Sequence, residues 1–289
     1  HGTLPTELGQ LTALSLLDVS SNSITGSLPT EWAQLPALSF LNVGENFLTG
    51  TLFSTELGQL TALTFLGVYA NGMTGTLPTE LGQLTRLKAI FAEQNQFRGT
   101  LPAELGQLTE MTHVYLGENL LTGPIPRTLA TWTNLQTFSV EENDLTGSLP
   151  TELGAWTALE TLSMRNNQLT GTVPTELGQL SVLQSMDLSI NSMNGTVPTE
   201  FGQLLALQWF TVANNSITGS LSVVGNLSSL QAYDVSVNNL TGTLPTWLGQ
   251  MTSLPYFSVK TNSLTGTLPT EGLMTRLEFL DLSDNGFDG

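Results

Sequence analysis

Cysteine is absent from this 289-residue chain, and basic residues are scarce. Without thiols the chain can form no disulfide framework and offers no cysteine nucleophile or metal ligand, although this alone does not exclude secretion. Seven Lys and Arg stand against 24 Asp and Glu, which gives a net charge of −17. So few cations cannot neutralise a phosphate backbone, and nucleic acid is therefore not an expected partner.

Long apolar runs are also missing, since no stretch of the sequence is apolar over the length that a bilayer requires. Any association with a membrane is therefore expected only through a parent protein that contains this chain. Histidine is nearly absent as well, because His113 is the only one beyond the first residue. The side chains that most often serve as general bases and metal ligands are thus in short supply.

What the chain does contain is one short pattern that recurs twelve times. In every copy an asparagine lies four residues before a glycine, and successive asparagines are 23 to 25 residues apart. A repeat of this size cannot bury its own apolar face and must stack on its neighbours, so the pattern predicts a solenoid. We take residues 1–289 as one domain, and as a fragment of a longer protein because His1 lies inside a repeat. The repeats begin at Gly2, Gly26, Gly50, Gly75, Gly99, Gly123, Gly147, Gly171, Gly195, Gly219, Gly242 and Gly266.

The residues before each asparagine alternate between apolar and variable positions. In the first repeat Leu17 and Val19 are apolar, whereas Leu16, Asp18 and Ser20 occupy the variable positions. This period of two indicates a short strand with one buried face, and one strand per repeat gives a parallel β-sheet. The Thr-Glu-Leu-Gly sequences predict short 3₁₀ or α turns on the convex face. The expected fold class is therefore an α/β solenoid.

The asparagines come where the chain turns inward after each strand. An Asn amide carries both donors and an acceptor, and buried turn groups need hydrogen-bond partners. Asparagines in register along the whole chain therefore predict a structural ladder rather than an active site. The ladder comprises Asn22, Asn46, Asn71, Asn95, Asn119, Asn143, Asn167, Asn191, Asn215, Asn238, Asn262 and Asn285.

The pattern LxxLxxLxLxxNxLTGxLPxELGxL resembles the plant-type extracellular leucine-rich repeat (LRR) of receptor-kinase ectodomains and polygalacturonase-inhibiting proteins. One copy runs from Leu159 to Pro174 as LETLSMRNNQLTGTVP. The resemblance covers essentially the whole chain. It implies a right-handed superhelix with the parallel sheet on its concave, partner-binding face, and a second short strand at Leu-Thr-Gly-x-Leu-Pro. The chain departs from that family in lacking the cysteine pairs that usually cap its ends.

Information can reside only where the repeats differ, which is at the outward strand positions. In repeats 3 to 7 these positions hold aromatic and charged residues; by register Phe91 and Tyr115 are neighbours, and so are Glu141 and Arg165. Aromatic rings beside charges supply contact area and specificity, so we expect a binding site for a protein, peptide or glycan on the concave face. The candidate residues are Phe65, Tyr69, Phe91, Glu93, His113, Tyr115, Glu118, Glu141, Glu142 and Arg165, with Trp209 as a second anchor.

The expected function is that of a non-enzymatic recognition module, extracellular or at the cell surface. A catalytic triad would have to combine His113 with Ser139 and Glu118 on a flat sheet that offers no water-excluding pocket, so no catalytic residue is assigned. The carboxylates among the candidate residues could supply oxygen ligands to Ca²⁺. The nearby Arg165 weakens that interpretation, and no metal or cofactor is expected.

Two alternative functions stay open. The residues that flank each glycine form columns of hydroxyls, as in Thr170-Gly171-Thr172, and such a flat threonine array resembles the ice-binding faces of some repeat proteins. Arg98, Pro124 and Asn194 interrupt these columns. The other alternative is a structural or adhesive array at the cell surface, which would associate end to end because a bare solenoid end exposes apolar surface.

The sequence also contains four N-glycosylation sequons, all within repeats 8 to 10. Four is about the chance number in a chain so rich in Asn, Ser and Thr. We therefore treat them only as possible glycosylation sites. They begin at Asn194, Asn214, Asn226 and Asn239.

Overall fold

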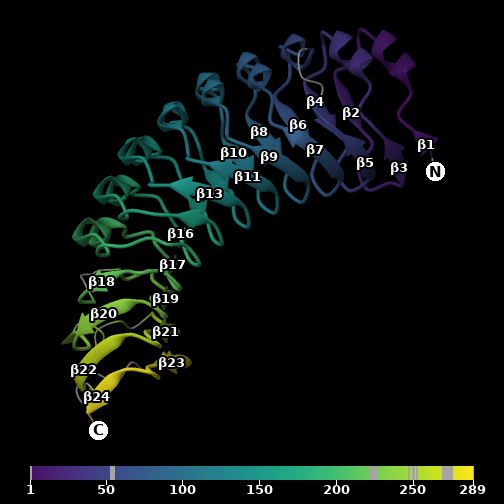
Figure 1. Cartoon of the computed structure of the whole chain (residues 1–289). Coiled ribbons are helices and arrows are strands. Elements are labelled where there is room, and N and C mark those ends of the chain that lie inside the picture. The colour runs from purple at the N-terminus through teal and green to yellow at the C-terminus, as the bar shows by residue number, and fades with distance from the viewer. Residues whose placement is uncertain are drawn as a thin grey trace. The chain divides into compact units, whose positions relative to one another are not determined.

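A computed structural model gives the fold, and it describes residues 2–52, 56–221, 227–246, 248, 251, 253–268 and 276–288. The sequon at Asn226 therefore lies outside the described residues. The chain divides into two compact units, unit 1 with residues His1–Leu145 and unit 2 with residues Thr146–Gly289. Each unit is described by itself, and both are built from the same repeat (Figure 1).

Each repeat contributes one three-residue strand to a parallel sheet, called here the main sheet (Figure 1). The strands pair without offset, so that Leu17 faces Leu41 in the next repeat. The central residue of each strand points inward, and Leu41 and Leu162 are fully buried. In unit 1 the strands are β2 (Leu16–Asp18), β4 (Phe40–Asn42), β6 (Phe65–Gly67), β8 (Ala89–Phe91), β10 (His113–Tyr115) and β12 (Thr137–Ser139). In unit 2 they are β14 (Thr161–Ser163), β16 (Ser185–Asp187), β17 (Trp209–Thr211), β19 (Ala232–Asp234), β21 (Tyr256–Ser258) and β23 (Phe279–Asp281).

A second set of short parallel strands follows the asparagines, as the resemblance implies. In unit 1 these are β1 (Gly2–Thr3), β3 (Ile24–Gly26), β5 (Phe47–Gly50), β7 (Gly72–Thr76), β9 (Gln96–Gly99) and β11 (Leu120–Gly123), and β13 (Asp144–Gly147) contains the division between the units. In unit 2 they are β15 (Gln168–Leu169), β18 (Thr218–Gly219), β20 (Asn239–Gly242), β22 (Ser263–Thr267) and β24 (Gly286–Asp288). Together with the main sheet they confirm the expected solenoid class.

The Thr-Glu-Leu-Gly sequences form 3₁₀ helices, as predicted, and a proline precedes most of them. Pro fixes φ near the value a helix needs and lacks the N–H that a first turn leaves unpaired. Unit 1 contains η1 (Thr6–Gln10), η2 (Thr30–Gln34), η3 (Leu57–Gln59), η4 (Thr79–Gln83), η5 (Ala103–Gln107) and η6 (Arg127–Thr131). Unit 2 contains η7 (Thr151–Ala155), η8 (Thr175–Gln179) and η9 (Thr199–Gln203).

The core of each unit is a stack of leucine side chains between these layers, with a few larger residues inserted. Trp132 in unit 1 and Trp156 in unit 2 replace a buried leucine and are 1% and 0% exposed. The indole N–H of Trp132 donates to the carbonyl of Leu105 in the preceding repeat at 2.9 Å. A large aromatic side chain with a polar edge is thus accommodated because its N–H finds a backbone partner.

The ladder asparagines tie each repeat to the one before it. In Asn95 the amide nitrogen donates to the carbonyls of Ala92 and Glu93 in its own turn, at 3.3 and 3.2 Å. It also donates to the carbonyl of Val68 in the preceding repeat at 3.0 Å, and the amide oxygen accepts the Met73 N–H at 3.0 Å. One buried side chain therefore binds four backbone groups of its own and the preceding repeat.

The residue directly before each ladder asparagine adopts a left-handed backbone conformation, which the sequence analysis did not foresee. All twelve have φ between 49° and 57°, and none is glycine. Among them are β-branched residues, such as Ile190, Val237 and Thr261, for which this conformation is unfavourable. The turn geometry thus takes precedence over the preference of the individual residue, and it fixes where Glu118 and Glu142 leave the backbone.

Candidate functional site

Five aromatic side chains lie next to one another on the outward face of the main sheet in unit 1. The pairing of β4, β6, β8 and β10 places Phe40 beside Phe65 in one row and Phe91 beside Tyr115 in the next. Ring centroids are 4.3 Å apart for Phe40 and Phe65, 5.2 Å for Phe65 and Phe91, and 4.7 Å for Phe91 and Tyr115. Tyr69 meets Phe91 edge-on at 6.4 Å. We call these five residues the aromatic ribbon.

The predicted neighbourhood of Phe91 and Tyr115 is thus present in the structure, but the sequence analysis missed Phe40. It occupies the same repeat position as Phe65, 25 residues earlier, and this alignment was the signal available. All five ring side chains are half-buried, chiefly against one another and the sheet. The ribbon therefore offers a continuous apolar strip bounded by polar backbone turns, which single scattered aromatics would not provide.

Two glycines in unit 1 allow this arrangement. A Cβ atom at Gly44 would lie 2.4 Å from the ring of Tyr69, and one at Gly117 would lie 2.8 Å from the carboxylate of Glu141. In both places a long side chain from the next repeat lies flat across the glycine. Substitution of either glycine would therefore displace a side chain of the face.

A row of carboxylates borders the ribbon. Glu93 follows Phe91 by two residues and is half-buried, and its Oε2 atom is buried without a hydrogen-bond partner. Burial raises the pKa of the Glu93 carboxyl and the nearby negative charges of Glu141 and Glu118 add to the rise, whereas hydrogen bonds from the backbone of Glu93 and Ala92 oppose it in part. Glu118 accepts a hydrogen bond from the Gln94 side chain at 3.0 Å, and the Ser139 hydroxyl donates to Glu141. The border of the ribbon is therefore acidic and carries one carboxylate oxygen with unmet hydrogen-bonding capacity.

The remaining candidates in unit 1 lie at the edges of this surface. His113 aligns with Ala89 and Thr137, and its Nδ1 lies 2.9 Å from the hydroxyl oxygen of Thr112. Glu142 is exposed in its left-handed turn. In the part of the chain that the structure describes, no three His, Asp or Glu side chains are arranged to hold a metal ion.

Unit 2 carries the other two candidates, Arg165 and Trp209, both exposed. They border a hollow of about 300 Å³ on the outward face of the main sheet, together with Asp187, Asp234 and Tyr256. The Asp187 carboxylate accepts hydrogen bonds from the backbone and hydroxyl of Ser189, two residues on, at 2.9 and 2.5 Å. Since Arg165 and Glu141 belong to different units, their expected proximity stays a prediction.

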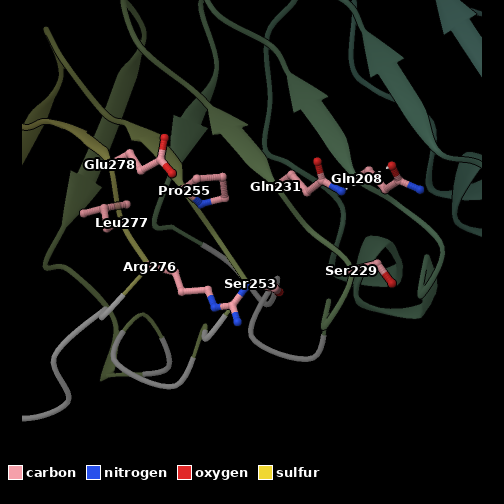
Figure 2. Close-up of a pocket in the computed structure, with 8 residues that line it drawn as sticks. All are labelled: Gln208, Ser229, Gln231, Ser253, Pro255, Arg276, Leu277 and Glu278. Atoms are coloured by element: carbon pink, nitrogen blue, oxygen red, sulfur yellow. Dashed lines mark hydrogen bonds between the residues drawn. The ribbon is translucent and has the colours of Figure 1, made fainter.

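A larger hollow of about 760 Å³ lies beside the main sheet near the end of unit 2. Figure 2 shows Gln208, Gln231 and Glu278 along one side of it and Arg276 on the other. The Gln231 amide donates to the Gln208 side chain at 3.5 Å, as repeated polar residues do along a solenoid. Arg276 directly follows residues 269–275, which lie outside the described part of the chain, so we assign no binding site to this hollow.

The threonines that flank the glycines contact the neighbouring repeat. The methyl group of Thr51 would lie 2.7 Å from a Cβ at Gly75, so the threonine after one glycine covers the next glycine. The threonine before each glycine uses its hydroxyl differently: Thr74 donates to the carbonyl of Gly50 at 3.2 Å. Both columns remain largely exposed, but many of their hydroxyls already serve the stacking of the repeats.

Three of the four sequon asparagines are described, and Asn194, Asn214 and Asn239 are all exposed. Asn214 has a left-handed backbone with φ of 53° and lines the hollow beside Trp209. A glycan there would occupy the same surface as a ligand of Trp209. Glycosylation of these residues stays a prediction.

Comparisons with known proteins find leucine-rich-repeat proteins. A family model described as Leucine Rich Repeat matches residues 13–35 and 158–180. The plant peptide hormone receptor RGFR1, solved in complex with RGF2, is similar with a TM-score of 0.90 and 29% identity, over 99% of this chain and 50% of that one. The Leptospira interrogans LRR protein LIC12759 is 31% identical with a TM-score of 0.78, over 99% of this chain and 70% of the other.

A plant ice-binding protein is also similar, with a TM-score of 0.74 and 27% identity over 86% of this chain and 83% of that one. No curated protein matches the chain in sequence. The chain spans about half the length of the first receptor structures that it matches. Within the described residues, no helix has the length and apolar character that a membrane span requires.

Proposed function

This chain belongs to the leucine-rich-repeat family, and we propose that it is an extracellular recognition module that binds a protein or peptide on the main sheet of unit 1. The observation that carries this proposal is the aromatic ribbon. Rigid aromatic side chains supply large contact area at little entropic cost, and they dominate the binding energy of many interfaces. The scaffold positions of the repeats are uniform, so a specific ligand has to be read by side chains such as these.

The similar proteins support binding rather than catalysis. The plant peptide hormone receptor RGFR1 was solved with RGF2 bound. In this chain the ribbon lies on an open sheet, where an extended segment could cross several repeats, and the only interior histidine contacts a threonine. We therefore infer a ligand that is held by surface contacts and is not chemically changed. A glycan in place of a peptide is one outcome that the experiment below would reveal.

The proposal is tested by selecting binders for the whole chain from a library of random 12-residue peptides and retesting them on a Phe91→Ala/Tyr115→Ala variant. The affinity of the selected peptides is expected to fall by roughly tenfold or more, because two central aromatic contacts are lost. The melting temperature should stay nearly unchanged, since both rings lie outside the core. Unchanged affinity for every selected peptide would contradict the proposed site, and selective binding on a glycan array would replace a peptide by a glycan ligand.

Phe47→Ala provides the matched control. Phe47 is an aromatic residue of unit 1 that is 64% exposed, but it lies in β5 of the second sheet rather than on the ribbon. Its removal changes the exposed apolar area of the same unit without touching the proposed site. Affinity should therefore match that of the unmodified chain, whereas an equal loss in the control would indicate non-specific hydrophobic adhesion.

Ice binding is the second candidate function, because the chain spans most of the similar plant ice-binding protein and displays exposed threonine columns. Thermal hysteresis and ice-crystal shape measure it directly. Faceted crystals that become disc-shaped in a Thr196→Lys/Thr243→Lys variant would support this function, since both residues are exposed and follow a glycine. Disc-shaped crystals with the unmodified chain at high concentration would dismiss it.

The extracellular location is tested by expression through a secretory pathway. Mass spectrometry should then find glycans on the exposed sequons Asn194, Asn214 or Asn239. End-to-end self-association remains a separate prediction, motivated by exposed apolar residues such as Leu11 and Leu280, which are 49% and 46% exposed in the first and last repeats. Sedimentation at increasing concentration would detect it.

A further inference from the structure

No ion pair in the described residues involves the carboxylates that border the aromatic ribbon. Lys88 pairs instead with Glu110 at 3.6 Å, and both side chains are about half exposed. Glu93 has no such partner, although its carboxylate is half-buried and its Oε2 atom accepts no hydrogen bond. A buried acceptor without a partner costs free energy in the folded state, and a ligand that supplies a donor to this half-buried carboxylate would offset that cost.

The surroundings of Glu93 narrow the chemistry of that donor. Glu93 follows Phe91 by two residues, and across the repeats it lies between Tyr69 and Gly117. Two backbone hydrogen bonds fix this position: the Ala70 N–H donates to the Glu93 carbonyl, and the Gln94 N–H donates to the Gly117 carbonyl. The carboxylate of Glu141 lies over Gly117 and adds negative charge from the far side. Aromatic faces and carboxylates together favour a cation that can be partly desolvated, such as guanidinium or ammonium.

A metal ion fits this place less well than an organic cation. Hard divalent ions require several oxygen ligands at short distances, and the described carboxylates form no group of three with that arrangement. A guanidinium group, in contrast, stacks on an aromatic ring and donates to a carboxylate at the same time. The combination of ring and acid therefore complements an arginine or lysine side chain.

The dimensions of the ribbon indicate the shape of the ligand. From Phe40 in β4 to Tyr115 in β10 it crosses four strands, which are ~4.8 Å apart, so it is ~14 Å long. An extended chain advances ~3.3 Å per residue, so about four or five residues would cover this length. Apolar side chains of such a segment could contact the rings while a basic side chain reaches the acidic border.

We propose, building on the proposed function, that the ligand of the aromatic ribbon is an extended peptide segment with a Lys or Arg whose cationic head group binds the Glu93 carboxylate beside Tyr69, Phe91 and Tyr115. The partner is thus basic where this chain is acidic, and electrostatic attraction also accelerates the encounter. The Glu93 carboxylate gains a charged donor from the ligand. The rings supply the contact area, and the carboxylate selects the basic residue.

The test begins with the peptides whose binding depends on Phe91 and Tyr115. They should be enriched in Arg or Lys, and replacing that residue by neutral citrulline or norleucine should weaken binding by roughly tenfold. The Glu93→Gln variant should bind the basic peptide more weakly by a similar factor. It should also bind the charged and neutral peptides about equally. This loss of discrimination is the signature of a direct contact, and a purely structural role of Glu93 would weaken both peptides alike.

Glu104→Gln is the control for net charge. Glu104 is an exposed carboxylate of unit 1 in η5, away from the main-sheet face, so the variant loses the same charge without touching the ribbon. If Glu104→Gln lowers the affinity as much as Glu93→Gln, the attraction is a bulk effect and the inference is overturned. Peptides that need Phe91 and Tyr115 but show no preference for a cation would overturn it while leaving the proposed function standing. If no selected peptide depends on Phe91 and Tyr115, both fail.

Discussion

The outward faces of the main sheet in the two units differ, although the repeats beneath them are the same. In unit 1 neighbouring repeats place Phe91 and Tyr115 side by side at one strand position. In unit 2 the equivalent position holds Asp187, Asp234 and Asp281, and their carboxylates accept hydrogen bonds from serines two residues further on. The aspartates are satisfied within their own repeat, whereas the aromatic rings depend on their neighbours.

This difference separates what the scaffold needs from what a ligand could use. A side chain that closes its hydrogen bonds locally has little left to offer a partner, and it maintains solubility at low cost. A strip of half-buried rings, next to a carboxylate whose Oε2 atom accepts no hydrogen bond, retains unused binding capacity. The comparison therefore supports the proposal that recognition belongs to unit 1.

Rewriting one repeat of unit 1 in the pattern of unit 2 should have the largest effect. Phe91→Asp with Glu93→Ser recreates the Asp-x-Ser arrangement of Asp187 and Ser189, so the repeat should stay folded. Binding of the selected peptides should fall by about a hundredfold, because an aromatic hot spot typically contributes about 2 kcal/mol or more and the cation partner is lost with it. Calorimetric titration measures the affinity, and circular dichroism verifies the fold. Retained affinity would place the binding site elsewhere.

Much of this comparison was accessible from the sequence because the repeats define the register. Once the asparagines are aligned, Phe91 and Tyr115 must be neighbours on one face, and the parallel sheet and the 3₁₀ turns follow from the repeated residues. The second strand was implied by the resemblance to plant-type repeats. The resemblance to plant-type extracellular leucine-rich repeats is confirmed by the family match and by the receptor structures. A periodic chain thus reveals more of its fold than an irregular one, since each position is sampled many times.

Features that depend on a single neighbour could not be predicted in this way. The carboxylate of Glu141 lies over Gly117 and contributes to the raised pKa of Glu93, and nothing in the pattern of one repeat indicates this. The left-handed residue before each asparagine was also missed, because Ile190 and Val237 give no sign of it. Its conformation is imposed by the hydrogen bonds of the turn and not by the residue that occupies it.

The ladder asparagines test whether the two scaffolds are equivalent. Asn143 in unit 1 and Asn191 in unit 2 each donate to three backbone carbonyls and accept one N–H at distances of 2.9 to 3.2 Å. Replacing either by Ala should lower the free energy of unfolding by about 1–3 kcal/mol, because buried backbone groups lose their partners. Urea unfolding measures the loss.

The control for this pair is Asn134→Ala. Asn134 is exposed, and its amide makes one long hydrogen bond of 3.5 Å to the carbonyl of Thr109. Its removal should therefore change stability little. A large loss of stability in one unit and a small one in the other would show that the two scaffolds differ. The comparison of the two outward faces would then have to allow for that difference in stability.

The left-handed column offers a stabilising change. Val237 has φ of 53° and is 38% exposed, so its side chain gains little from packing while its backbone is strained. Val237→Asn should raise the free energy of unfolding by about 1 kcal/mol, since Asn tolerates this conformation far better than a β-branched residue. Val182→Asn is the matched control, because Val182 is 42% exposed and is not among the residues with positive φ. Equal effects of the two substitutions on the free energy of unfolding would refute the backbone strain at Val237.

The smallest effect concerns the pH dependence of stability, and it should have opposite signs for Glu93 of unit 1 and Asp281 of unit 2. Burial raises the pKa of the Glu93 carboxyl in unit 1, so the folded state holds its proton more tightly than the unfolded chain does. Below the unfolded-state pKa the Glu93 carboxyl is protonated in both states and does not change the free energy of unfolding. As the pH rises from there through the folded-state pKa, the ionised Glu93 increasingly lowers the free energy of unfolding. Glu93→Gln should therefore stabilise the free chain at pH 7, by less than about 1 kcal/mol because the side chain is only half-buried, and should have no effect at about pH 3.5.

Asp281 in unit 2 provides the opposite case. Hydrogen bonds from the Ser283 hydroxyl and backbone lower the pKa of its carboxyl. Its stabilising contribution is present above the unfolded-state pKa and is lost as the pH falls through the folded-state pKa, so Asp281→Asn should weaken the chain slightly at pH 7 and not in strong acid. Urea midpoints of both variants between about pH 3 and pH 7 measure the two slopes. If the Glu93 and Asp281 variants shift stability in the same direction at neutral pH, ionised Glu93 is not a destabilising group that a ligand could neutralise. The contrast between the two outward faces is then limited to their aromatic rings.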